Sequence, residues 1–319
     1  MSGPAKGADH SDRRPPVPEP PRSEERAVRR GVVQAVAVRY PVAVFIVLAF
    51  VVSWVAWVPL LADRQGWVGW SASTYLHLLG GLGPLVAAVI VTALSRGWDG
   101  LGVLWSQMTA WRGRGRWLAL AALGPLALFL VALVVARLVG GEWPTLDRFG
   151  ASAEYPALPI VVYWLVNLVF YGFGEEVGWR GYLQPTLELR RPVLRAAAIL
   201  SVVWALWHLP LFGITAGYRQ MPTVGFIGFY FSLLVAALVF AWLWHRSGCS
   251  LLVVAVFHAA FDIAATTPTD TTLIPILMGA AVSLAGLATI PALRTMEPAR
   301  AAGAGAGPGR PPAAKEVQG

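Results

Sequence analysis

The stretch Gly174-Glu175-Glu176-Val177-Gly178-Trp179-Arg180 places three ionisable side chains inside an apolar part of the chain. Residues 161–173, which precede it, are apolar or aromatic apart from Asn167. The chain is therefore expected to lie in a lipid bilayer or a helix bundle when it reaches the two carboxylates. Because ionisable groups are costly in such surroundings, we expect these side chains to serve a function.

Helical spacing gives the two glutamates different surroundings. Arg180 follows Glu176 by four residues, so the two side chains share one face of a helix and can form an ion pair. The Glu175 side chain points about 100° away from that of Glu176 and stays available for other work. The alternative is that the ion pair only fixes helix packing, since buried ion pairs can be architectural.

The composition predicts a membrane protein. The chain has 319 residues, of which 56% are hydrophobic and 13% are charged, and no water-soluble domain of this length could bury so much apolar surface. Its single cysteine, Cys249, excludes an internal disulfide and a multi-cysteine metal site. The net charge of +8 comes from Arg residues at the ends of hydrophobic runs. This placement indicates topology signals and contact with lipid headgroups, and it excludes a nucleic-acid partner.

The hydrophobic runs predict an all-α fold, a polytopic bundle of about eight transmembrane helices in one domain over residues 36–295. Residues 1–35 and 296–319 are expected to be disordered tails. The patch Gly80-Gly81-x-Gly83 is expected to support helix packing within the chain. The expected spans are 41–62, 74–95, 117–139, 157–189, 195–213, 224–245, 250–267 and 273–293.

Basic side chains gather in alternate loops, which predicts the orientation. They include Arg39, Arg112, Arg190, Arg246 and Arg294. The positive-inside rule therefore predicts that both termini of this multi-pass protein are cytoplasmic. Frequent Ala, Val, Arg and Trp residues are typical of a GC-rich genome, so we expect the inner (plasma) membrane of a bacterium.

Two more expected spans carry ionisable side chains. One contains His208, and another contains His258 and Asp262 one helical turn apart. A lone histidine in a span often only hydrogen bonds to another helix. At 1.5 Å per residue, however, Glu175 and His208 both lie about 20 Å from the basic ends of their helices, and His258 about 12 Å. We expect these three to meet in a water-accessible cavity that opens to the cytoplasm.

Such a cluster suits amide hydrolysis. A carboxylate beside an imidazole in a low-dielectric cavity can hold and deprotonate a water molecule. A second imidazole, oriented by Asp262, can stabilise the oxyanion that forms when the water attacks a carbonyl. The same groups could instead hold Zn²⁺ through Glu175, His208 and His258. A His-Glu-x-x-His helix is absent, so both alternatives stay open.

Three motifs in this order resemble the CPBP family of CAAX-processing and bacteriocin-processing intramembrane proteases, also called Abi proteins. The motifs are Glu175-Glu176-x-x-x-Arg180, Trp204-x-x-x-His208 and His258-x-x-x-Asp262. The resemblance covers residues 157–265 and includes the type II CAAX prenyl endopeptidases. It implies an intramembrane endopeptidase, and the family has been described both as metalloproteases and as glutamate-type proteases.

The resemblance also implies roles for the motif residues. Glu175 is similar to the water-activating glutamate of the family, and His208 helps to bind that water. His258 and Asp262 fall where the family stabilises the oxyanion or binds a metal, and Glu176 and Arg180 where it has supporting groups. Trp204 replaces the usual Phe, which we expect to change the shape of the pocket more than its chemistry. Asp262 replaces a frequent Asn and adds a charge.

The expected substrate is a membrane-embedded or lipid-associated protein or peptide, such as a leader or a bacteriocin-like peptide. Two other functions compete with this hypothesis. In an ion- or proton-coupled transporter, Glu175, His208 and His258 would form a relay, although no repeat relates the two halves of the chain. A noncatalytic membrane scaffold or immunity protein would tolerate the loss of any motif residue, whereas all of them are present.

Overall fold

Helices make up all the regular structure of the computed structural model, which describes residues 23–140 and 142–299. Seven helical segments among these residues are long and apolar enough to cross a membrane. The expected all-α, polytopic fold is thereby confirmed. The segments are α2 (Pro41–Arg64), α3 with α4 (Tyr75–Gly81 and Gly83–Met108), α5 (Gly115–Gly140), Ile160–Glu188, α9 with the 3-10 turn η3 (Val193–Trp207 and Leu209–Gly213), α11 (Thr223–Arg246) and α13 (Leu273–Thr295).

The expected span 250–267 is a shorter helix than the sequence predicts. It is α12 (Leu251–Thr266), with 16 residues, which gives a length of about 24 Å against the roughly 30 Å of a hydrocarbon core. A left-handed turn at Gly248 and Cys249, with φ angles of 69° and 60°, sets its start. The Ser250 hydroxyl then caps the helix by accepting a hydrogen bond from the Val253 amide.

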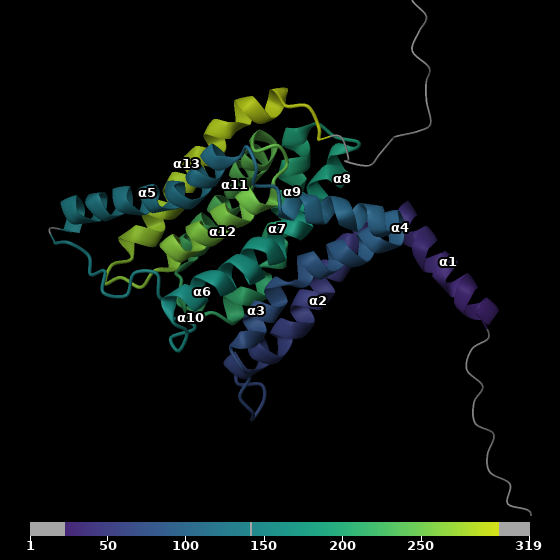
Figure 1. Cartoon of the computed structure of the whole chain (residues 1–319). Helices are drawn as coiled ribbons and strands as arrows, with labels where there is room; N and C mark the ends of the chain where they lie inside the picture. The colour runs from purple at the N-terminus through teal and green to yellow at the C-terminus, as the bar shows by residue number, and fades with distance from the viewer. Residues whose placement is uncertain (1–22, 141, 300–319) are drawn as a thin grey trace, which may run out of the picture.

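The expected N-terminal tail needs a second correction. Helix α1 (Ser23–Arg39) begins inside the stretch 1–35 that was expected to be disordered. Acidic residues follow its start and Arg39 lies in its last turn, an arrangement that favours a helix through its macrodipole. Figure 1 shows that α1 extends away from the bundle. Residues 1–22 and 300–319 of the two expected tails lie outside the described residues.

The segment Ile160–Glu188 runs through the middle of the molecule. It consists of α6 (Ile160–Asn167), the π-helical segment η1 (Leu168–Phe173), α7 (Gly174–Gly178), the π-helical segment η2 (Trp179–Leu183) and α8 (Gln184–Glu188). Figure 1 shows α7 and α12 in the centre, with α2 and α3 on one side and α5 and α13 on the other. The residues of α7 are all buried.

Glycines let the backbone of α7 touch the end of α3 and the start of α4. A Cβ on Gly174 would lie 2.8 Å from the carbonyl oxygen of Gly81, and a Cβ on Gly178 would lie 2.6 Å from the carbonyl group of Pro84. Such small-xxx-small spacing is a common solution for helix packing in membranes. Gly80 and Gly83 likewise lie against side chains of α2. The intrachain packing expected for the Gly80-Gly81-x-Gly83 patch is confirmed.

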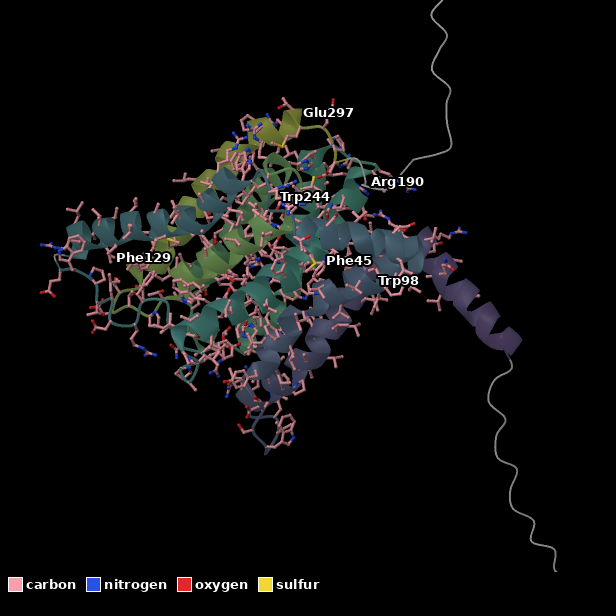
Figure 2. All side chains as sticks on the ribbon, viewed as in Figure 1. Phe45, Trp98, Phe129, Arg190, Trp244 and Glu297 are labelled. Atoms are coloured by element: carbon pink, nitrogen blue, oxygen red, sulfur yellow. The ribbon has the colours of Figure 1, made fainter. Side chains whose placement is uncertain are left out.

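The two ends of the bundle differ in charge. The basic end carries Arg39, Arg112, Arg190 and Arg246, and Figure 2 labels Arg190. The distal end consists of the loops 65–74, 142–159, 214–222 and 267–272, together with α10 (Ala216–Arg219). Figure 1 shows α10 and the α2–α3 loop on the side of the molecule away from α1 and α8.

We predict that Gly178→Ala lowers the yield of monodisperse, detergent-extracted protein. The new Cβ collides with the backbone of Pro84, which cannot move aside as a flexible side chain could, and such overpacking costs about 1–3 kcal/mol. Gly228→Ala is the matched control, because Gly228 is an exposed helical glycine with open space around it. Equal yields for the two variants would contradict the packing argument.

Candidate active site

The backbone around Glu175 and Glu176 is not a regular α-helix. The π-helical segments η1 and η2 lie directly before and after α7. Glycine lowers helix propensity, and four glycines occur between residues 172 and 181. π-Helical turns are rare and frequently occur at functional sites. The sequence predicted one regular helix over residues 157–189, and neither π-helical segment was predicted.

The Glu176 carboxylate is fully buried and holds two partners. Arg180 Nη1 donates to Glu176 Oε1 over 3.0 Å, and both side chains are 0% exposed. The Arg180 guanidinium also lies 5.1 Å from the ring centre of Trp204 and 4.6 Å from that of Phe240, distances typical of cation–π contacts. The ion pair expected from the i, i+4 spacing is therefore present.

His258 is the second partner of Glu176. Its Nδ1 lies 2.8 Å from Glu176 Oε1, and its Nε2 lies 3.6 Å from Asp262 Oδ2. The sequence predicted that Asp262 orients His258, but it did not predict the contact between His258 and Glu176. The structure connects Arg180, Glu176, His258 and Asp262 in a row. His258 is thus oriented by one carboxylate on each side of its ring.

Glu175 receives its hydrogen bonds from tryptophans. Trp204 Nε1 donates to Glu175 Oε2 over 2.7 Å, and Trp179 Nε1 donates to the same oxygen over 3.4 Å. Within the described residues, Glu175 Oε1 has no hydrogen-bond partner. The expectation that Trp204 alters shape more than chemistry is wrong, because the phenylalanine usual at this position has no N–H to donate.

His208 lies at the end of α9, where the chain turns into η3. Its Nδ1 is 2.7 Å from the carbonyl oxygen of Trp204, so Nδ1 carries the proton and Nε2 keeps a lone pair. The Trp204 ring centre is 5.3 Å from that of His208 and 5.9 Å from that of His258. Glu175, His208 and His258 therefore surround one indole ring, although Glu175 hydrogen bonds to neither histidine among the described residues.

The expected zinc ligands do not fit a metal ion in this geometry. In the part of the chain that the structure describes, no three His, Cys, Asp or Glu side chains are grouped so that they could hold one. Both ring nitrogens of His258 face carboxylates, and Glu175 Oε2 is taken by indole N–H groups. A catalytic zinc site needs three protein ligands about 2.0–2.3 Å from the ion.

Comparison with known proteins identifies this part of the chain. Residues 157–264 match the family model described as type II CAAX prenyl endopeptidase Rce1-like. This segment is an Rce1-like domain. It contains all three sequence motifs, and the resemblance inferred from them is confirmed.

Two relatives of known name are similar to part of this chain. CAAX prenyl protease 2 of Methanococcus maripaludis is 25% identical over 140 residues, which cover 41% of this chain and 49% of the relative. Lysostaphin resistance protein A of Staphylococcus haemolyticus is 24% identical over 147 residues, which cover 46% of this chain and 36% of the relative. The chain therefore spans less than half the length of either relative.

The members of the site differ in exposure along the bundle. Asp262 lies one turn before the end of α12. Its side chain is 32% exposed, the largest exposed fraction in the row that starts at Arg180. On the basic side, Trp179, Arg180 and Leu183 are fully buried. The expected cavity that opens to the cytoplasm stays a prediction.

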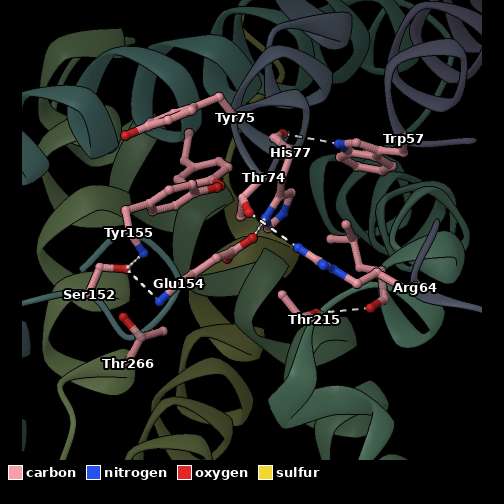
Figure 3. A network of polar contacts seen from close by, with 12 residues as sticks. Trp57, Arg64, Thr74, Tyr75, His77, Ser152, Glu154, Tyr155, Thr215 and Thr266 are labelled. Atoms are coloured by element: carbon pink, nitrogen blue, oxygen red, sulfur yellow. Dashed lines mark hydrogen bonds and ion pairs between the residues drawn. The ribbon is translucent and has the colours of Figure 1, made fainter. Parts of the chain in front are cut away.

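A further buried pair, His77 and Glu154, was not predicted from the sequence. His77 Nδ1 lies 2.8 Å from Glu154 Oε1, as Figure 3 shows. Neither residue belongs to a motif, and 77 positions separate them. A histidine in the first turn of an apolar helix was the available signal. A third buried group lies at the basic end, where Glu188 Oε1 accepts hydrogen bonds from Gln184 and His245.

We expect Arg180→Ala to unfold much of the protein. The substitution leaves the Glu176 carboxylate buried without its cation, and breaking a buried pair in this way costs about 3–5 kcal/mol. Adding Glu176→Gln removes the charge and should restore part of the yield. The measurement is the fraction of monodisperse protein after detergent extraction. Arg190→Ala, which alters an exposed arginine, should match the wild type.

Proposed function

We propose that this chain is an intramembrane endopeptidase that hydrolyses a peptide bond of a membrane-associated protein or peptide. The observation that carries the proposal is the hydrogen bonding of the two Glu175 carboxylate oxygens. Two indole N–H groups hold Oε2 of its buried carboxylate, while Oε1 has no partner among the described residues. The presence of an Rce1-like domain around this carboxylate supports the same function.

In the proposed mechanism, Glu175 Oε1 and His208 Nε2 hold a water molecule between them. Glu175 takes a proton from the water as its oxygen attacks the carbonyl carbon of the substrate. Glu176 holds His258 Nδ1 at 2.8 Å, whereas His258 Nε2 lies 3.6 Å from Asp262 Oδ2, beyond hydrogen-bond range, so Nε2–H donates a hydrogen bond to the oxyanion that forms. The C–N bond then breaks, its electron pair stays on nitrogen, and the amine gains a proton. Water thus supplies the hydroxyl group of one product and a proton of the other.

We propose that the carboxylate of Glu175 activates the water without a metal ion. The orientation of His258 between two carboxylates supports this choice, since a ligand to zinc needs a free nitrogen lone pair. Hydrolysis should therefore persist after exhaustive treatment with 1,10-phenanthroline. The treated and untreated enzymes should have rates within about twofold of each other, a small change beside the tenfold that 1.4 kcal/mol represents. Loss of activity that added Zn²⁺ restores would refute the proposal.

The test of the proposed reaction compares the peptides of cells that express the wild type or Glu175→Gln. The amide keeps the size of the carboxylate but cannot accept a proton, so a cleaved fragment should appear only with the wild type. Loss of a general base typically costs 10²–10⁴-fold in rate. Glu142→Gln makes the same change at an exposed position and should leave the fragment in place. Full turnover by Glu175→Gln would contradict the assignment of the base.

We further propose that the basic end is cytoplasmic, as the positive-inside rule indicates, so that the distal loops lie on the outer side. Gly69→Cys in a distal loop should then react with a membrane-impermeant maleimide on intact cells, whereas Arg190→Cys should react only after lysis. Burial raises the pKa of the native Cys249 thiol to about 11, so this thiol stays protonated at pH 7 and the wild type serves as an unlabelled control. The reverse pattern would invert the topology.

A further inference from the structure

A second imidazole–carboxylate pair lies beside the proposed catalytic groups. His77 is 8% exposed, and its Nδ1 is 2.8 Å from Glu154 Oε1. The carboxylate fixes the proton of the ring on Nδ1 and directs Nε2 away from itself. Figure 3 shows His77 on α3 pointing towards Glu154 in the loop that precedes α6. The pair has the arrangement in which a carboxylate orients a histidine for proton transfer.

The structure holds both members of the pair in place. The His77 carbonyl accepts a hydrogen bond from Trp57 Nε1 over 3.0 Å. The Ser152 hydroxyl accepts hydrogen bonds from the amides of Glu154 and Tyr155, at 3.2 and 3.1 Å. These contacts fix the turn that carries Glu154 and the first turn of α3. The side chains therefore meet in one defined geometry, as proton transfer requires.

A chain of aromatic contacts links His77 to the surroundings of Glu175 and His208. The ring centre of His77 is 5.5 Å from that of Tyr171, which lies one helical turn before Glu175. Trp57 contacts His77 at 5.9 Å and Trp207 at 4.7 Å, and Trp207 in turn lies 4.9 Å from His208.

The free nitrogen of His77 is the feature that the proposed mechanism does not use. Nε2 forms no hydrogen bond with any described residue, although the side chain is almost completely buried. Some described polar atoms without a hydrogen-bond partner are completely enclosed by protein, but His77 Nε2 is not one of them. A small part of this nitrogen is therefore accessible from outside the protein. The pair lies towards the distal end, as does Asp262, whose side chain is 32% exposed.

We propose that His77, oriented by Glu154, is a further catalytic residue that donates a proton to the leaving amine. This inference rests on the proposed endopeptidase function. The neutral His77 ring, with its own proton on Nδ1, first receives at Nε2, through water, the proton that Glu175 took from the attacking water. As the C–N bond breaks, its electron pair moves to nitrogen, which takes that proton from His77 Nε2 and leaves His77 neutral again. The net reaction is the addition of one water molecule across the peptide bond.

The experiment compares two probes that differ only in the leaving group. One is the peptide whose cleavage distinguishes wild-type cells from Glu175→Gln cells, and the other is its depsipeptide, with oxygen in place of the scissile N–H. An amine leaves only when protonated, whereas an alkoxide is a much better leaving group. His77→Gln should therefore lower kcat for the amide by about 10²-fold or more and that for the ester by less than about tenfold.

Three controls separate the possible explanations. Glu175→Gln should lose both activities, because both need the activated water, and Glu142→Gln should lose neither. Glu154→Gln should show the selective loss of His77→Gln to a smaller degree, since it keeps an acceptor for Nδ1–H. An equal loss of both activities in His77→Gln would show a merely structural role and overturn the inference alone. A wild type that cleaves neither purified probe would overturn the proposed function and this inference with it.

Discussion

The buried Glu176 carboxylate is the interaction on which the rest of the site depends. One of its oxygens receives Arg180 from the same helix and His258 from α12. Arg180 in turn lies over the rings of Trp204 on α9 and Phe240 on α11. A single ion pair thus joins four membrane segments. Burying two charges is costly unless both are well paired, so the pair holds these helices in one relative position.

The close contact between α4 and α7 makes this burial possible. Because Gly174 and Gly178 have no side chains, the backbone of α4 lies directly against α7 and excludes water and lipid from that face. The same contact brings α3, at the start of the α4 segment, beside Tyr171 and therefore near Glu175. The glycines that frame the two glutamates consequently position both the ion pair and the His77–Glu154 pair.

Much of the fold could be predicted because hydrophobic length is a property of the sequence alone. The expected spans agree with the helical segments, and the order of the three motifs predicted the Rce1-like domain. Helix α12 and the π-helical segments were missed because tertiary packing, not hydropathy, sets where they begin and end. Helix α1 was missed because a polar, charged composition describes a solvated helix as well as a disordered tail.

The site could be predicted only where its contacts are local. The Glu176–Arg180 pair follows from i, i+4 spacing, whereas 82 residues separate Glu176 from His258 and 77 separate His77 from Glu154. Trp204 was treated as an apolar residue, and its N–H group was overlooked.

The hydrogen bond from Trp204 Nε1 to Glu175 gives the two adjacent glutamates different surroundings. A cation beside a carboxylate stabilises its ionised form strongly and so weakens it as a base. Glu176 has such a cation in Arg180, an arrangement that fits a carboxylate with a structural role. Glu175 is instead held by neutral indole N–H groups, which orient the carboxylate while leaving its charge uncompensated. Among the described residues Glu175 forms no ion pair, which is consistent with the role of general base proposed for it.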